Sequence, residues 1–244
     1  MTDAPLAWFD TYLRGEGGLL SHRPVTIEVQ GEAGGWRELD DWPPPGDPKR
    51  WYLHPGGLLA PETPASPSPP DQYRYDPADP TPSVGGIGML TGGPVDNREL
   101  EARADVLVYT SDRLADPLVL IGTVEAELWV NSSLDHTDFF VRLCDVSPDG
   151  TSVNICDGLQ RLNPSSIRRS ADGSFRVSVP MWPVGHRLGA GHRLRVHVSS
   201  GAHPVYARNL GTGEDVATAT AMCPAEQAVY HEPGKLSFVT LPYT

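Results

Sequence analysis

Basic residues are scarce in this sequence of 244 residues, which has 19 Lys and Arg against 31 Asp and Glu. The formal net charge is −12 when histidine is counted as neutral. Proteins that bind a nucleic-acid duplex neutralise its phosphates with clustered Lys and Arg, and anionic membrane surfaces attract the same residues. The basic residues here are scattered along the chain. Neither nucleic acid nor a membrane is therefore a predicted partner.

Cysteine and long apolar runs are scarce as well. Cys144, Cys156 and Cys223 fit no C-x-x-C or zinc spacing, so they predict no metal site. Cys144 and Cys156 flank a predicted hairpin, but we expect both to stay reduced, as thiols of cytoplasmic proteins do. The first residues lack the basic start and apolar stretch of a secretory signal, and no window approaches the ~18 apolar residues of a membrane-spanning helix. These absences predict a cytoplasmic protein.

Recognisable catalytic motifs are missing too. The sequence contains no G-x-S-x-G nucleophile elbow and no H-E-x-x-H zinc helix. It also contains no phosphate-binding loop and no G-x-G-x-x-G dinucleotide motif. We therefore predict no catalytic residue, no metal and no cofactor for this chain.

Polar residues of catalytic types do occur, but structural roles explain them. His197 lies in a predicted strand and His203 follows it, where a histidine commonly points outward or hydrogen-bonds at the strand end. Residues 135–138 (Asp-His-Thr-Asp) crowd ligand types into one loop, yet closeness along the chain does not give convergence in space. Asp145 and Asp157 flank the hairpin, and we expect them to cap turns.

Glycine, proline and alternating apolar residues are abundant. The 25 Gly and 25 Pro indicate many turns between short strands. Alternation with period two and short apolar runs predict strands at 25–29, 36–39, 51–54, 105–109, 118–130, 175–179, 194–198 and 236–240. The S-P-D-G turn at 147–150 predicts a hairpin of two more strands, 138–146 and 152–162. We expect 118–130 to be one long, half-buried antiparallel strand. Because no amphipathic helices separate these strands, the pattern predicts an all-β sandwich or jelly roll and not an α/β fold.

The one predicted helix covers residues 5–14. Trp8, Phe9 and Leu13 place much apolar surface on this short helix, so it must pack against something. One interpretation is that it packs on the sandwich of this chain. The other is that it docks on a domain outside this chain.

The composition divides the chain into three parts. Residues 1–59 form a small N-terminal segment, and residues 60–83 are dominated by Pro, Ser, Thr and Asp. That composition predicts an extended connector, partly in the polyproline II conformation. Residues 84–244 are expected to form the main sandwich.

Four groups of short motifs occur in order over residues 70–244. They are Y-D-P-A-D-P-T-P at 75–82 with Gly85-Gly86, G-P-V-D-N-R at 93–98 with E-A-R-A-D-V-L-V-Y-T-S at 101–111, T-D-F at 137–139 with P-D-G at 148–150 and D-G at 157–158, and G-H-R-L-R-V at 191–196 with R-N-L at 208–210. Together they resemble the C-terminal domain of the Xaa-Pro dipeptidyl-peptidase and cocaine-esterase-like (CocE/NonD) serine hydrolases. The segment from Ala7 to Gly15 resembles the last helix of the family's α/β-hydrolase domain.

The resemblance implies a galactose-binding-like jelly roll preceded by a helix-plus-strand remnant of a hydrolase domain in residues 1–59. In the family, the nucleophile and its Asp and His partners lie N-terminal to that helix, so this chain is expected to be non-catalytic. The implied partner is an α/β-hydrolase domain with dipeptidyl-peptidase, esterase or acylase activity. The family's loop after the double glycine approaches the acyl pocket. Met89 and Leu90 are therefore candidates for lining that pocket, with ordinary core packing as the other explanation.

Two other functions remain open at this point. One is a free-standing galactose-binding-like module that binds a sugar or a peptide on its loops. The other is an enzyme that acts through a Ser/His/Asp set without a recognisable motif.

Overall fold

The structure is a computed structural model, and it describes residues 3–16, 23–87, 92–215 and 217–243. The helical elements are α1 (Asp3–Phe9), η1 (Asp10–Arg14), η2 (Pro55–Gly57) and α2 (Arg98–Glu101). The strands are β1 (Val25–Gly31), β2 (Gly35–Leu39), β3 (Asp47–His54), β4 (Leu58–Ala60), β5 (Asp71–Tyr75), β6 (Leu107–Thr110), β7 (Leu118–Gly122), β8 (Glu125–Ser132), β9 (Thr137–Val146), β10 (Ser152–Leu162), β11 (Phe175–Pro180), β12 (Val184–Leu188), β13 (Arg193–Ser199), β14 (Ala225–Tyr230) and β15 (Phe238–Tyr243).

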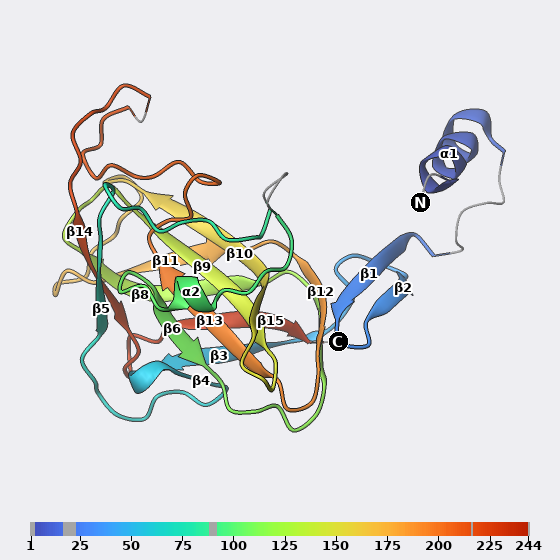
Figure 1. Cartoon of the computed structure of the whole chain (residues 1–244), viewed down its shortest axis with the longest axis horizontal. Helices are drawn as coiled ribbons and strands as arrows, with labels where there is room; N and C mark the ends of the chain where they lie inside the picture. Colours follow the sequence, from blue (N-terminus) through green and yellow to red (C-terminus); the bar gives the residue numbers. More distant parts are fainter. Residues whose placement is uncertain (1–2, 17–22, 88–91, 216, 244) are drawn as a thin grey trace.

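Most of the strands form a β-sandwich around one apolar core, as the sequence predicts (Figure 1). One set runs in the order β10, β9, β13 and β6, with antiparallel neighbours. In a second set, β8 lies between β11 and β14, and β5 pairs with β14. Val141 and Leu143 of β9 and Leu128 and Val130 of β8 belong to the same buried cluster. The galactose-binding-like subclass of this sandwich stays a prediction.

The predicted single strand at 118–130 is wrong, because the chain changes partners in the middle of it. β7 pairs with β12 and meets β15 at one position, whereas β8 pairs with β11, β14 and β15. The break falls just after Gly122, whose φ of +137° suits glycine best and whose position lies against Pro242 and Pro43. Alternation of apolar residues continues through the break, so the hydrophobic pattern alone does not show it.

The strand pairing crosses the boundaries drawn from composition. β3 and β4 lie in the predicted N-terminal segment, yet β3 pairs with β15 and β4 meets β6 at one position. β5 lies within the predicted connector and pairs with β14. The division at residues 59 and 83 stays a prediction, but residues 47–75 contribute strands to the sandwich sheet.

The N-terminal hairpin of β1 and β2 joins the sandwich at one strand. β1 runs parallel to β12 and pairs Gln30 with His186 and Gly31 with Arg187. Gly31 has a φ of +89°, and a Cβ there would lie 2.3 Å from the Arg187 carbonyl oxygen. Only glycine allows the hairpin to approach β12 this closely.

The N-terminal helix lies apart from the sandwich (Figure 1). It begins at Asp3, changes to the wider η1 turn at Asp10, and stops at Gly15, whose φ is +71°. Trp8, Phe9 and Leu13 are 50 %, 50 % and 73 % exposed. Among the described residues, then, the apolar side chains of this helix are not covered by the sandwich. None of the described helices has the length and apolar character needed to cross a membrane.

Candidate functional site

We define the double-glycine loop as residues 84–97. Its described parts, 84–87 and 92–97, are hydrogen-bonded to side chains of β9 and β10. Two backbone hydrogen bonds close it, because Gly86 and Gly93 each donate an N–H to the other's carbonyl, at 3.0 and 2.8 Å. Met89 and Leu90, the predicted pocket-lining residues, lie outside the described residues. The structure therefore shows the base of the loop and how that base is held.

A buried ion pair lies directly beneath this base. Arg142 of β9 donates from Nη2 to Asp157 Oδ2 of β10 at 2.9 Å, and both side chains are almost completely buried. Its other terminal nitrogen, Nη1, donates to the Val84 carbonyl at 2.5 Å and to Asn97 Oδ1 at 2.7 Å. One guanidinium thus binds both ends of the double-glycine loop and one strand of the sheet.

A buried amide extends this network. Asn154 of β10 accepts the Val95 N–H at 2.9 Å and donates to the Gly93 carbonyl at 3.0 Å. The Asn97 backbone N–H donates to the Ser152 carbonyl at 2.8 Å. The C-terminal half of the loop is therefore hydrogen-bonded to β10 at several points.

Gly85 and Gly86 must be glycines, because atoms of the loop and of this network lie where their Cβ atoms would be. A Cβ on Gly86 would lie 2.8 Å from Asp157 Oδ2, and a Cβ on Gly85 would lie 2.5 Å from the Gly93 carbonyl oxygen. Both residues have positive φ, +80° and +61°, which L residues rarely adopt. The Gly-Gly pair therefore has a specific structural cause at this site.

A groove of about 340 Å³ lies beside the loop. Its lining includes Gly86, Ile87 and Pro94 of the loop together with Trp182 and Pro183. The side chains of Ile87 and Trp182 are large, apolar and about half exposed. Such a groove suits an apolar group of a substrate or of a neighbouring domain.

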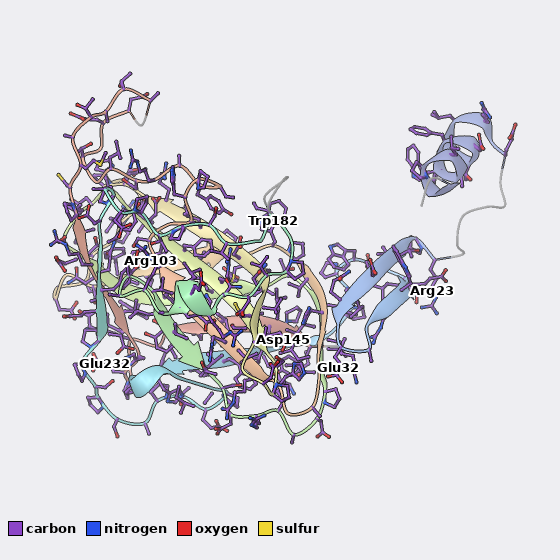
Figure 2. The ribbon with its side chains drawn as sticks, in the orientation of Figure 1. Arg23, Glu32, Arg103, Asp145, Trp182 and Glu232 are labelled. Carbon is purple, nitrogen blue, oxygen red and sulfur yellow. The ribbon has the colours of Figure 1, made fainter. Side chains whose placement is uncertain are left out.

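A second cavity, of about 410 Å³, adjoins the first and carries a chain of titratable groups. Asp145 Oδ2 lies 3.0 Å from His186 Nε2, and its Oδ1 lies 2.7 Å from His192 Nδ1. His192 Nε2 is also 3.2 Å from Glu32 Oε2. Figure 2 shows Asp145 and Glu32 on the side of the sandwich that carries the β1–β2 hairpin, with Trp182 on the same side. These contacts tie the hairpin to the sandwich.

The expected turn-capping role of Asp145 and Asp157 is therefore wrong. Asp145 binds two histidines and Asp157 binds Arg142, because both side chains project from strand positions. Asp149 caps the turn instead, accepting the Ser147 hydroxyl at 2.5 Å and the Thr151 N–H at 3.0 Å.

A further buried cluster lies under α2. Nε2 of His197 on β13 lies 2.9 Å from Glu101 Oε1 and 3.8 Å from Cys144 Sγ, while Arg195 pairs with the other oxygen of Glu101. Burial alone would lower the pKa of His197, but the Cys144 sulfur and the Glu101 carboxylate outweigh it and raise that pKa to about 9. For Glu101, burial raises the pKa, but hydrogen bonds from His197 and Ser152 outweigh it and lower that pKa.

This cluster fits an ion-paired network better than a reactive or metal-binding site. The thiol and the carboxylate face the same nitrogen of His197, so they cannot act as nucleophile and orienting acid of a relay. The ligand atoms of Glu101, Cys144 and His197 lie within 4.8 Å of one another, which would allow a cation. However, Arg195 already neutralises Glu101, and Nδ1 of His197 has no partner among the described residues, whereas metal-bound histidines usually donate from their second nitrogen.

The structure also assembles a Ser/His/Asp chain that no sequence motif indicates. Ser68 Oγ lies 2.9 Å from His231 Nδ1, and His231 Nε2 lies 3.1 Å from Asp71 Oδ2. Tyr109 donates its hydroxyl to the same Asp71 oxygen at 2.8 Å. Burial raises the pKa of Asp71, but the hydrogen bonds from His231 and Tyr109 outweigh it and hold that pKa below its usual value.

This chain of groups lacks what a serine nucleophile needs. In G-x-S-x-G hydrolases the N–H after the nucleophile binds the oxyanion, but Ser68 is followed by Pro69, which has no N–H. His231 is also buried, at 1 % exposure. The arrangement is better explained as an anchor that ties the Pro-rich segment 60–70 to the sandwich.

The remaining sequence candidates do not converge on one another. Asp135 pairs with Arg169, whereas Asp138 pairs with Arg161 and accepts from Asn209, so the predicted loop residues separate. Cys144 and Cys156 are both unoxidised.

The two thiols lie on opposite faces of the β9–β10 hairpin. Cys156 is paired with Leu143 and belongs to the apolar core, whereas Cys144 faces His197 on the other face. A disulfide between them would require the strands to shift.

Comparison with known proteins identifies the chain's relatives. A family profile described as the X-Pro dipeptidyl-peptidase C-terminal non-catalytic domain matches residues 20–240. The chain is 37 % identical to the cocaine esterase of Rhodococcus sp. (strain MB1 Bresler), in a match that covers 97 % of this chain and 44 % of the esterase.

Two solved structures share the fold over essentially the whole chain. An aminopeptidase from a marine sediment archaeon, Thaumarchaeota archaeon, has a TM-score of 0.85 and 25 % identity, covering 100 % of this chain and 44 % of the aminopeptidase. An α-amino acid ester hydrolase has a TM-score of 0.82 and 26 % identity, covering 99 % of this chain and 44 % of the hydrolase. The chain thus spans less than half the length of these relatives. It belongs to the family of X-Pro dipeptidyl-peptidase C-terminal non-catalytic domains.

Proposed function

We propose that this chain is the accessory β-sandwich of a serine hydrolase and packs against an α/β-hydrolase domain, on the same or on a separate polypeptide. The observation that carries the proposal is helix α1, together with η1. It exposes five large apolar side chains, Leu6, Trp8, Phe9, Tyr12 and Leu13, although the sandwich has its own closed core. An exposed apolar patch of this kind marks an interaction surface. The matched relatives are more than twice as long, which leaves room for such a domain.

The double-glycine loop is the part of the sandwich that we assign to the substrate. Its base is fixed by a buried network and lies beside an apolar groove that includes Ile87 and Trp182. On this proposal, Met89 and Leu90 would form part of the wall of the acyl pocket and exclude water from it. The relatives are named as a cocaine esterase, an aminopeptidase and an α-amino acid ester hydrolase, so the substrate class is an acyl ester or amide.

The reaction of such an enzyme needs no cofactor, and this chain would supply no reacting group. Its contribution would be the shape and dryness of the pocket, which change the binding of the acyl group and the stability of the transition state. The cytoplasmic location inferred from the sequence stays a prediction.

A reconstituted enzyme tests the proposal. The catalytic portion of the Rhodococcus esterase, cut before the region that matches this chain, is joined to residues 1–244 and assayed with p-nitrophenyl esters. We expect hydrolysis well above that of the catalytic portion alone or this chain alone. Activity no higher than the sum of the two parts would overturn the proposal.

Paired variants show whether the helix provides the contact. Leu13→Ser should lower the affinity of this chain for a separately expressed catalytic portion. Leu58→Ser is the matched control, because Leu58 is also an exposed leucine but lies on the sandwich at the end of β4. Equal loss in both variants would contradict a role specific to α1 and η1.

A further inference from the structure

We propose that Arg142 is a positioning residue that sets the acyl specificity of the enzyme by holding the two ends of the double-glycine loop together. The inference rests on the proposed function, because it assumes that this loop faces the substrate. Arg142 lies on β9 with 2 % of its side chain exposed and therefore cannot touch a substrate itself. It would act only through the backbone that it holds.

The first support is the arrangement of its hydrogen bonds. A single nitrogen, Nη1, donates to the carbonyl of Val84 at the start of the loop and to the side chain of Asn97 at its end. The neighbouring Nη2 donates to Asp157 on β10. These contacts fix the separation of the loop ends and their height above the sheet. A guanidinium presents several donors in one rigid plane, whereas a lysine ammonium cannot reach acceptors in this arrangement with the same precision.

The second support is that the ion pair leaves some of its buried polar atoms without hydrogen bonds, so stability alone does not explain it. Arg142 Nε and Asp157 Oδ1 are buried and have no hydrogen-bond partner among the described residues. Replacing a buried ion pair with apolar residues of similar size is often neutral or stabilising. We therefore infer that the pair serves the geometry of the loop, which an apolar pair would not reproduce.

The third support is the tight fit of the loop against this pair. Gly86 has no Cβ because one would collide with Asp157 Oδ2 and approach Arg142 Nη2 to 3.3 Å. The backbone of the loop therefore lies directly against the ion pair at Gly86. A displacement of Asp157 or Arg142 would therefore move the Gly86–Gly93 closure.

The experiment compares Arg142→Met with the double variant Arg142→Met/Asp157→Leu in the full chain. The single variant leaves Asp157 buried without its partner and is expected to unfold at a lower temperature. The double variant removes both charges, so it should melt at a higher temperature than the single variant. Arg74→Met is the matched control, since Arg74 forms an exposed ion pair with Glu226.

Hydrogen exchange reports directly on the loop. In the double variant, the amides of Gly86, Gly93 and Val95 should exchange about 10- to 100-fold faster than in wild type. That range corresponds to losing hydrogen bonds from a charged donor. Core amides of β8 and β9 should keep their protection. Unchanged exchange at all three loop amides would overturn the positioning role, because an apolar pair would then hold the loop as well as the ion pair does.

Kinetics of the joined enzyme described above separate this inference from the proposed function. The double variant should raise KM for a p-nitrophenyl phenylacetate probe more than for the acetate, while labelling of the nucleophile by a fluorophosphonate keeps its rate. Arg142→Lys should show a preference between the two esters that lies between that of the double variant and that of the wild type. If the wild-type joined enzyme is inactive, the proposed function fails while the exchange result still stands. If it is active and the double variant keeps the wild-type preference between the two esters, this inference alone fails.

Discussion

The N-terminal helix and the sandwich use apolar residues in opposite ways. In the sandwich, large side chains such as Phe139, Leu128 and Leu143 are completely buried in one cluster. In α1 and η1, Trp8 and Leu13 are at least half exposed. Burying a large apolar side chain stabilises a fold by about 1.5–3 kcal/mol. The side chains of the sandwich core provide this stabilisation, whereas the exposed side chains of the helix do not. The sandwich therefore has a stabilising core of its own, and the exposed helix agrees with our proposal that it contacts a hydrolase domain.

The largest effect should come from breaking the sandwich core. Phe139→Ala removes a fully buried ring and leaves a cavity, which should lower the free energy of unfolding by about 3–5 kcal/mol. Urea denaturation followed by circular dichroism measures this change. A loss below about 1 kcal/mol would mean that the side chains around Phe139 repack easily, which contradicts a well-packed core.

A smaller, pH-dependent effect should come from the polar layer outside that core. The pKa of His197 in the fold is about 9, above the ordinary 6.5, so protonation stabilises the folded state. This contribution is fully present below about pH 6.5 and is lost as the pH rises through 9. It amounts to about 3 kcal/mol. Urea midpoints of the wild type should fall between pH 6.5 and 9.5, and those of His197→Gln should fall less. Identical pH profiles would show that His197 does not carry the effect.

The smallest effect on folding should come from the helix. Leu13→Ser in the isolated chain should change the free energy of unfolding by less than about 0.5 kcal/mol, because Leu13 is largely exposed. The same change should weaken binding to a catalytic portion, as described above. Thermal unfolding and binding to the catalytic portion, measured on one preparation, compare the effect of Leu13→Ser on stability with its effect on binding. A destabilisation as large as that of Phe139→Ala would mean that the helix packs on its own sandwich.

The sequence predicts the regular strands well and misses the irregular ones. Alternating apolar residues correctly indicate β11 and β13, and the S-P-D-G turn correctly indicates β9 and β10 on either side of it. β12 alternates in burial, but a histidine, His186, occupies its central buried position, so the apolar pattern does not indicate the strand. β5 lies within the segment 60–83, whose Pro-rich composition predicts an extended connector and not a strand. The helix was predicted, but its change of winding at Asp10 has no signal in the residue pattern.

At the site, the sequence indicates most of the residues involved but not the one that connects them. The motif residues Gly85, Gly86, Asn97 and Asp157 carry the family resemblance, and the structure brings them together around one side chain. That side chain, Arg142, was not singled out, because its partners lie 15 to 58 residues away along the chain. Strand register decides which of these residues meet, and no local pattern encodes it. The Ser68–His231 contact spans 163 residues and was missed for the same reason.

Fluorophosphonate labelling tests most directly whether this domain shapes a reaction that another domain performs. The isolated chain and the joined enzyme are each treated with the probe, and the labelled peptide is mapped by mass spectrometry. Our account predicts no label on residues 1–244 in either sample, and a label on the catalytic portion of the joined enzyme. A label on Ser68 that disappears in both Ser68→Ala and His231→Gln would contradict it, because the sandwich would then hold a nucleophile of its own.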